Sequence, residues 1–408
     1  MGIKAPAASL MLASTFFLAG CGAATASTGS SPPNTASGPI KIGVVTSESG
    51  PLSDYGQQEI RGLKLGILYA TKGTDKVDGR SIQLLIRDDG GSPSQGSTMM
   101  KDLILNDHVV MVQGPAYSAV AIPMEQVAGQ YKVPLLIDPA ADDDLTTTYL
   151  NPYVFRTAAD TYMYAAAYAD YLKSHGGASG QTFYQFAPNY SFGTSSVKDW
   201  ATALTDAGAK NLGVLYAPET TTDFSSYIDK ILALNPLPKE LVVTWAGVGA
   251  VDLFKQMEQA GLYQKMKVIG AIGGYNGLKA LGHAANGFIG VTDYYYSLAN
   301  GTANSYLVKH YQAKYGEPPD LFSGTSFAAG QAMVQALSKA GSTKASALIR
   351  ALSGMTIEAP KGTETIGQSS HQATQPMYVV KLVWNSSAGY AVPQDIMTVP
   401  NLAGQPGQ

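Results

Sequence analysis

The chain has 408 residues, of which 27 are lysine or arginine and 30 are aspartate or glutamate, so its net charge is −3. This weak charge gives no support to nucleic-acid binding. The single cysteine, Cys21, excludes an internal disulfide. Beyond the N-terminal region about 370 residues remain, which is too many for one ordinary core and indicates two domains.

Residues 1–20 have the pattern of a secretory signal. Lys4 is the only charge before Cys21, and residues 7–19 are apolar or small. This run is too short for a membrane span, which needs about 20 apolar residues. The sequence Leu-Ala-Gly before Cys21 resembles the lipobox of bacterial lipoproteins, which implies cleavage before Cys21 and a diacylglycerol on its thiol. The alternative is an ordinary secretory signal with an incidental cysteine.

The segment after Cys21 is expected to be a disordered tether covering residues 21–38. Residues 22–38 carry no charge and no large apolar side chain, so they cannot bury enough surface to offset the entropy of ordering. We expect ordered structure from about residue 39, in a body that is held at the outer face of the cell membrane by the lipid. No other apolar run is long enough to span a membrane.

From residue 40 the chain alternates between predicted strands and helices. The first strand is "IKIGVV" (40–45), and helical spacing follows in "YGQQEIRGLKLGILYAT". The strands "IQLLIRDDG", "VVMVQGP" and "VPLLIDPA" then alternate with the helical stretches "GSTMMKDLILND" and "PMEQVAGQYK". This order predicts an α/β fold with a parallel sheet and helices on both faces.

A second alternating series begins at "TFYQFAP" (182–188) and runs to "MKVIGAIGG". Two successive α/β units predict two lobes. Ligands of such folds bind at the carboxyl ends of the strands, so the residues directly after each strand are the candidate site.

Several stretches together resemble the type I periplasmic binding proteins of the leucine/isoleucine/valine-binding family, over roughly residues 40–395. They include "IKIGVVTSESGPLSDYGQQEIRGLKLGI", "IRDDGGSPSQG", "YKVPLLIDPAADDDLT", "YVFRTAADTYM" and "TTDFSSYIDKILALNP". The resemblance implies two Rossmann-like lobes joined by three hinge crossings near residues 157–159, 291–295 and 355–358. Lobe 1 would hold residues 39–158 and 294–355, and lobe 2 residues 159–293 and 356–400.

The same resemblance implies an extracytoplasmic substrate-binding lipoprotein of an ABC importer, with a small organic solute and the permease and ATPase subunits as partners. It implies neither catalysis nor a cofactor. One alternative is a ligand sensor of the same fold without a transport role, and another is a secreted serine hydrolase.

The family's binding positions can be carried over to this sequence. By resemblance, the first lobe contributes Tyr55, the "GPAYSA" loop with Tyr117 and Ser118, and the "DPAAD" loop. The second lobe contributes Ile272 and the residues around "NYSFG". The remaining candidates are Ala140, Ala141 and Asp142 of the second loop, Tyr190, Phe192 and Phe327.

Two of these positions depart from an amino-acid site. Asp142 stands where the family has a threonine for the ligand carboxylate, and Ile272 stands where it has a glutamate for the ligand ammonium. Each unpaired buried charge costs several kcal/mol. We therefore expect weak binding of leucine, isoleucine or valine, and an amino-acid-like, amide-like or aromatic-acid ligand with an apolar body.

Two further stretches could suggest an enzyme or a metal site. "SGTSFAAG" (323–330) resembles the nucleophile segment of subtilisin-like proteases, but the chain lacks the matching histidine and aspartate motifs. "DDD" (142–144) lacks the glycine and the distal glutamate of a calcium loop. The five histidines have no metal-ligand spacing, so we expect neither catalytic residues nor a metal.

Overall fold

The structure, a computed structural model, describes Gly2 and residues 38–404. The expected signal, Cys21 and nearly all of the expected tether lie outside the described residues. Residues from Gly38 onward form one compact unit. No helix in the described part of the chain is both long and apolar enough to cross a membrane.

The first lobe is built on a six-stranded sheet with helices on both faces, as the alternating pattern predicted. Every neighbouring pair in this sheet is parallel except the short edge pair β2–β3. The strands lie in the order β2(Lys76–Val77), β3(Arg80–Asp88), β1(Ile40–Thr46), β4(Met111–Gln113), β5(Leu135–Ile137) and β6(Val154–Arg156).

Strand β1 is apolar along nearly its whole length because both of its faces are covered. Ile42 and Val44 pack under α1(Ser53–Ala70) and α10(Leu321–Ala340). Val45 points to the other face, under α2(Pro93–Leu105) and α3(Ser118–Tyr131). Helices α9(Thr302–Tyr315) and α11(Ala345–Leu352) complete this lobe.

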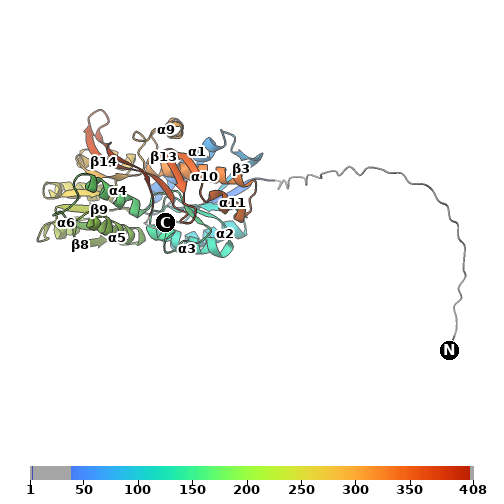
Figure 1. Cartoon of the computed structure of the whole chain (residues 1–408), viewed down its shortest axis with the longest axis horizontal. Helices are drawn as coiled ribbons and strands as arrows, with labels where there is room; N and C mark the ends of the chain where they lie inside the picture. The colour runs from blue at the N-terminus through green and yellow to red at the C-terminus, as the bar shows by residue number, and fades with distance from the viewer. Residues whose placement is uncertain (1, 3–37, 405–408) are drawn as a thin grey trace. The chain divides into compact units, whose positions relative to one another are not determined.

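The second lobe repeats the design with a four-stranded parallel sheet. Val242 and Ile269 face α4(Thr161–Ser174) and α5(Ser191–Asp206), while Val243 faces α6(Ser225–Leu232) and α7(Ala250–Gln259). Helix α8(Tyr275–Leu281) follows the last of its strands. The strands of this sheet lie in the order β10(Lys267–Gly270), β9(Glu240–Val243), β7(Thr182–Pro188) and β8(Lys210–Ala217). Figure 1 shows α1, α10 and α11 in one lobe and α4, α5 and α6 in the other.

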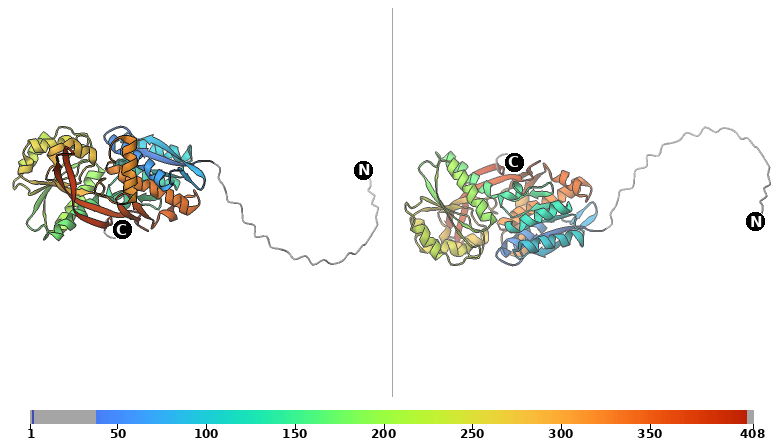
Figure 2. Two further views of the ribbon diagram at one scale, coloured as in Figure 1. Left: turned by 90° about the horizontal axis from the view of Figure 1, so that it is seen from above. Right: turned by 90° about the horizontal axis from the view of Figure 1, so that it is seen from below.

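A third, antiparallel sheet, which the alternating pattern did not predict, connects the lobes. The long strand β14 starts beside β13 and continues beside β11 and β15. Figure 2 shows the two longest strands, in red, running between the lobes. The members are β11(Ile289–Thr292), β12(Thr356–Ala359), β13(Gly362–Ile366), β14(Ala373–Asn385) and β15(Tyr390–Leu402).

Three crossings join the lobes. The first follows β6 and the second follows β11. The third was expected at residues 355–358, but Ile357 and Ala373 still pack in the core of the first lobe, whereas Met377 packs in the second. The third crossing therefore lies within the first residues of β14, and residues 356–373 belong to lobe 1.

Helices α1 and α10 approach so closely that glycines are required between them. A Cβ atom on Gly66 would lie 2.1 Å from the carbonyl oxygen of Phe327, and one on Gly62 would lie 2.3 Å from that of Ser323. Real Cβ contacts are never this short, so any side chain at Gly66 would push α1 away from α10. This pair of helices covers one face of the first sheet and also carries residues to the cleft.

We predict that Gly66→Ala lowers the free energy of unfolding by about 1–3 kcal/mol, the usual cost of overpacking a close contact. The matched control is Gly129→Ala in α3, where the nearest atoms, of Asn151, are 3.5 Å from the added carbon. The control should be neutral or up to about 1 kcal/mol more stable, because alanine favours a helix over glycine. Chemical denaturation of both variants measures this, and equal effects would contradict the packing argument.

Candidate functional site

A cavity lies between the lobes, at the carboxyl ends of the parallel strands. Loops after β1, β4, β5 and β6 line it from the first lobe, and loops after β7, β9 and β10 line it from the second. The first turns of α4 and α10 close it. This is where ligands bind in open α/β sheets, and it is where the sequence predicted the site.

The cavity walls are largely aromatic. Tyr55 packs against Phe322 with a distance of 4.5 Å between ring centroids, and Tyr190 lies 5.9 Å from Phe192. Aromatic walls suit a flat apolar ligand, and their hydroxyl or indole groups add polar contacts. The aromatic lining residues are Tyr55, Tyr164, Tyr190, Phe192, Trp200, Trp245 and Phe322.

Most of the residues singled out from the sequence lie at this cavity. Six of them line it: Tyr55, Ser118, Ala141, Tyr190, Phe192 and Ile272. Ala140 lies buried behind its neighbour, where its N–H donates to the carbonyl of Pro115 at 3.2 Å. Tyr117 packs its ring on Tyr190 at 4.7 Å, and its hydroxyl donates to Glu219 at 3.2 Å.

Asp142 does not line the cavity, although the sequence placed it against the ligand. Its carboxylate turns back to cap the short helix η1(Asp143–Thr146) and accepts the N–H of Asp144 at 3.1 Å. The side chain is 2% exposed. Burial raises the pKa of Asp142, and hydrogen bonds from Asp144, Ser191 and Ser195 oppose that rise. The aspartate at this position therefore serves to cap the short helix η1.

Phe327 also lies away from the cavity. It is fully buried in a cluster with Leu65, Leu307 and Tyr294, and its ring is 5.3 Å from that of Tyr69. The aromatic residue that α10 presents to the cavity is Phe322, one helical turn and a half earlier. The residue expected in the site is therefore part of the core between α1, α9 and α10.

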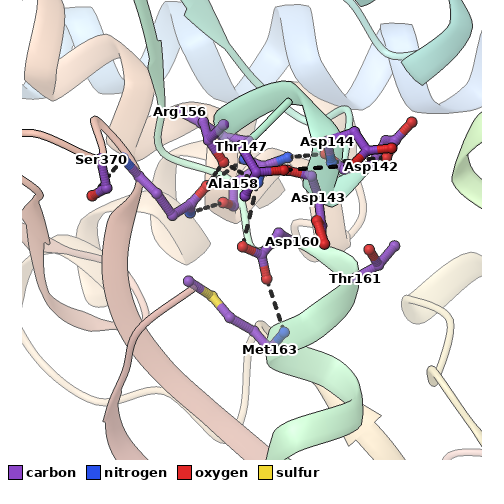
Figure 3. Close-up of polar contacts among 12 residues, drawn as sticks. Asp142, Asp143, Asp144, Thr147, Arg156, Ala158, Asp160, Thr161, Met163 and Ser370 are labelled. Atoms are coloured by element: carbon purple, nitrogen blue, oxygen red, sulfur yellow. Dashed lines mark hydrogen bonds and ion pairs between the residues drawn. The ribbon is translucent and has the colours of Figure 1, made fainter. Parts of the chain in front are cut away.

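Arg156 bonds to the loop that follows β5 and to the residue that caps α4 (Figure 3). This fully buried side chain at the end of β6 donates to the carbonyl of Asp142, to Thr146 at 2.5 Å and to Gln372 on the approach to the third crossing. It also pairs with Asp160 at 3.3 Å. Asp160 in turn accepts the N–H of Met163 at 2.8 Å and so caps α4.

One end of the cavity is suited to an anion. Ser118 is the first residue of α3, and its hydroxyl oxygen accepts the N–H of Asp142 at 3.3 Å, which leaves its O–H free to donate into the cavity. The N–H groups of Val120 and Ala121 already donate to the carbonyl of Tyr117, so the N–H groups at the first two positions of α3 and the helix dipole are what favour negative charge. The side chain and the helix end together can hold a carboxylate without a cationic residue.

The only charged side chain among the lining residues that the structure describes is Asp293. The sequence analysis did not single out Asp293, which begins the stretch "DYYYS". Its place in the sequence could have identified it, because Asp293 comes directly after β11, at the carboxyl end of a strand.

The two lobes touch across the cleft through side chains. Asp320, at the N-terminus of α10, accepts the N–H of Leu321 at 2.8 Å and the N–H of Asn276 in α8 at 2.9 Å. Lys198 of α5 pairs with Asp143 at 3.1 Å. Together with the Tyr117 to Glu219 bond, these contacts join the lobes on both sides of the cavity.

The protease-like segment lies inside α10. Ser326 is fully buried, and its hydroxyl donates to the carboxylate of Asp138, so it is not presented to a substrate. His175 lies at the end of α4, where its ring contacts the carbonyl of Tyr171 at 2.8 Å. Across residues 38–404, no cluster of three or more histidine, cysteine, aspartate or glutamate side chains has the arrangement of a metal site.

Comparison with known proteins establishes the family. Residues 39–389 match the family model of the periplasmic binding proteins, so the chain belongs to that family, with its type I fold of two α/β lobes. It is 23% identical to a Leu/Ile/Val-binding protein homolog 6 of Brucella suis over 352 residues, which cover 83% of this chain and 86% of the relative.

Solved structures show the same architecture. An ABC-type branched-chain amino acid transporter protein of Rhodopseudomonas palustris is 32% identical, with a TM-score of 0.75, and the match covers 88% of this chain and 96% of that one. A solute-binding protein of an R. palustris ABC transporter, in complex with 4-hydroxybenzoate, is 20% identical with a TM-score of 0.80, covering 89% and 97%.

Buried carboxyl groups behind the cavity make stability depend on pH. Glu125 in α3 is 1% exposed, and neither of its carboxyl oxygens has a hydrogen-bond partner in the part of the chain that the structure describes. Burial raises the pKa of Glu125 to about 10, although Arg156 opposes the shift. The folded protein therefore keeps a proton that the unfolded chain releases above its ordinary pKa.

We predict that the stabilisation linked to Glu125 is complete below pH 4.5 and is lost as pH rises toward 10, by up to about 1.4 kcal/mol per pH unit. Glu125→Gln, which stays neutral, should flatten the fall in unfolding free energy between pH 6 and pH 9. Glu258→Gln, an exposed change in α7, is the control and should leave the slope unaltered. Denaturation at several pH values measures both, and an unchanged slope in Glu125→Gln would show that this carboxyl is ionised when folded.

Proposed function

We propose that this protein is the extracytoplasmic receptor of an ABC importer and captures a small aromatic carboxylic acid between its lobes. The observation that carries the proposal is the cavity itself, in which aromatic walls surround a helix N-terminus with a free hydroxyl donor, Ser118. The ligand ring would lie among the aromatic side chains, and its carboxylate would accept from Ser118 and the first turn of α3. The related protein that holds 4-hydroxybenzoate supports this class of ligand.

The proposal includes binding without chemistry. The polar groups around the cavity are mostly committed to structural hydrogen bonds: Thr161 donates to Asp199, Tyr190 to the carbonyl of Ala246 and Thr325 to Asp138. None of these pairs forms a nucleophile with an adjacent base. A ligand sensor of the same fold is the alternative, and association with a permease, rather than with a signalling partner, distinguishes the two.

We predict that benzoate or a ring-substituted benzoate binds with micromolar affinity or better, and that leucine binds at least about 100-fold more weakly. Leucine would bury an ammonium group beside apolar Ile272, and an unpaired buried charge costs several kcal/mol. Ser118→Ala should weaken binding of the benzoate about 10-fold or more, because hydrogen bonds to charged groups are strong. Ser94→Ala in α2, away from the cleft, is the control.

Titration calorimetry measures these affinities. Tight binding of leucine with none of any benzoate would overturn the ligand class while leaving a receptor function intact. Conversion of the bound acid into a product would overturn the receptor itself.

We further propose that Cys21 is the mature N-terminus and carries the lipid, on the strength of the Leu-Ala-Gly-Cys sequence after an apolar run. Cys21→Ala should leave the protein either unprocessed or released from the membrane fraction. Fractionation of the wild-type and variant proteins with N-terminal sequencing measures this. A variant that is still cut between residues 20 and 21 and still held on the membrane would refute lipidation.

A further inference from the structure

Asp293 is the charged group of the cavity, and it is held in a fixed position. It is 2% exposed and follows β11, at the second crossing between the lobes. The hydroxyl of Tyr164 donates to its Oδ1 at 2.9 Å, and the Nζ of Lys361 lies 3.1 Å from its Oδ2. Because each oxygen is tied to a different element, the carboxylate cannot rotate freely.

Lys361 is itself fixed and does not line the cavity. It is fully buried and also donates to the side chain of Gln375, whose amide donates to the carbonyl of Thr157 at 3.3 Å. Its backbone carbonyl accepts from the hydroxyl of Tyr378 at 2.8 Å. The three crossings are therefore bonded to one another, and Asp293 is the member of this network that faces the cavity.

The carboxylate has acceptor capacity left over. Two carboxylate oxygens offer about four lone-pair positions, and the two protein donors occupy two of them. Lys361 pairs with Asp293 at 3.1 Å and also lies 3.8 Å from the buried carboxyl of Glu364. Burial raises the pKa of Glu364 to about 8, so Glu364 is mostly neutral at pH 7 and the charge of Lys361 balances that of Asp293. A ligand cation would add a further buried charge beside this balanced pair, whereas a neutral O–H or N–H group would complete the hydrogen bonding at no such cost.

We propose that Asp293 is a specificity residue that accepts a hydrogen bond from a neutral donor on the ligand, so that the preferred solute is an aromatic acid with a ring hydroxyl or amino group. This inference rests on the proposed function and names its substrate class more narrowly. Asp293 follows β11, whereas Ser118 is the first residue of α3, and both line the cavity. The ligand carboxylate and its donor would be read by separate elements.

The test compares ligands of nearly equal shape. The affinities of 3- and 4-hydroxybenzoate are measured by calorimetry against 3- and 4-methylbenzoate, which lack the donor. At one ring position or the other, the hydroxy compound should bind at least about 10-fold more tightly, because a carboxylate acceptor left without its donor in a closed site is costly. Likewise 4-aminobenzoate should bind more tightly than the cationic 4-(aminomethyl)benzoate.

Variants assign the preference to Asp293. Asp293→Ala should reduce the hydroxy-to-methyl affinity ratio to about one, whereas a general disturbance of the hinge would weaken both ligands alike and preserve the ratio. If Asp293→Ala does not fold, the double variant Asp293→Leu/Lys361→Met removes both buried charges and the acceptor together and should reduce the ratio in the same way.

The outcomes separate this inference from the proposed function. Equal affinity for the hydroxy and methyl compounds in the wild type, an unchanged ratio in the variant, or tighter binding of the cationic amine would overturn the role of Asp293 alone. Failure of every benzoate to bind would overturn the proposed function together with it.

Discussion

The shape of the cleft depends on the hydrogen bonds and the ion pair made by the buried guanidinium of Arg156. Arg156 lies at the end of β6, where the chain leaves the first lobe, and it bonds to Gln372, which precedes the third crossing. The same group holds the carbonyl of Asp142 and the carboxylate that caps α4. Removing it would leave several polar partners buried and unpaired, which is the costly way to break such a network. One side chain thus sets the position of a crossing, a cavity loop and a cavity helix.

The parallel sheets explain why the site is where it is. Strands buried on both faces can display polar chemistry only at their ends, and the carboxyl ends of both sheets open into the cleft. Loops of the two lobes therefore meet there, while the strands themselves carry little besides apolar side chains. The fold provides a rigid scaffold in which the loop sequences can change without disturbing the cores.

The sequence predicted the fold well because strands and helices each have their own period of apolar residues. Apolar strands and amphipathic helices alternate with spacings that depend on local geometry alone, and the end of each strand marks the cavity. The third crossing was placed too early because strands β12 and β13 pack on α10, a contact between distant segments that no local pattern records. Several of the expected residues line the cavity because they follow strands that the pattern placed.

Side-chain direction was the part that the sequence could not supply. Asp142 occupies a cavity loop, yet a cap hydrogen bond turns its carboxylate away. Phe327 lies on a cavity helix, but on the side that packs against α1. Asp293 was overlooked because the orientation of its carboxylate depends on hydrogen bonds from Tyr164 and Lys361, which lie 129 and 68 residues away in the sequence. Position along a strand predicts which backbone reaches the site, whereas tertiary hydrogen bonds decide which atoms face it.

The contacts between the lobes affect how readily the lobes can separate. Asp320 to Asn276, Tyr117 to Glu219 and Lys198 to Asp143 join the lobes through protein groups alone, so these contacts would have to break for the lobes to separate. The last of these joins a half-exposed lysine to a fully buried carboxylate, so it is not an ordinary surface ion pair. A ligand shifts the equilibrium only by its difference in affinity for the two forms. A solute that touches both lobes at once therefore adds its own contacts to these and favours the form in which the lobes are together.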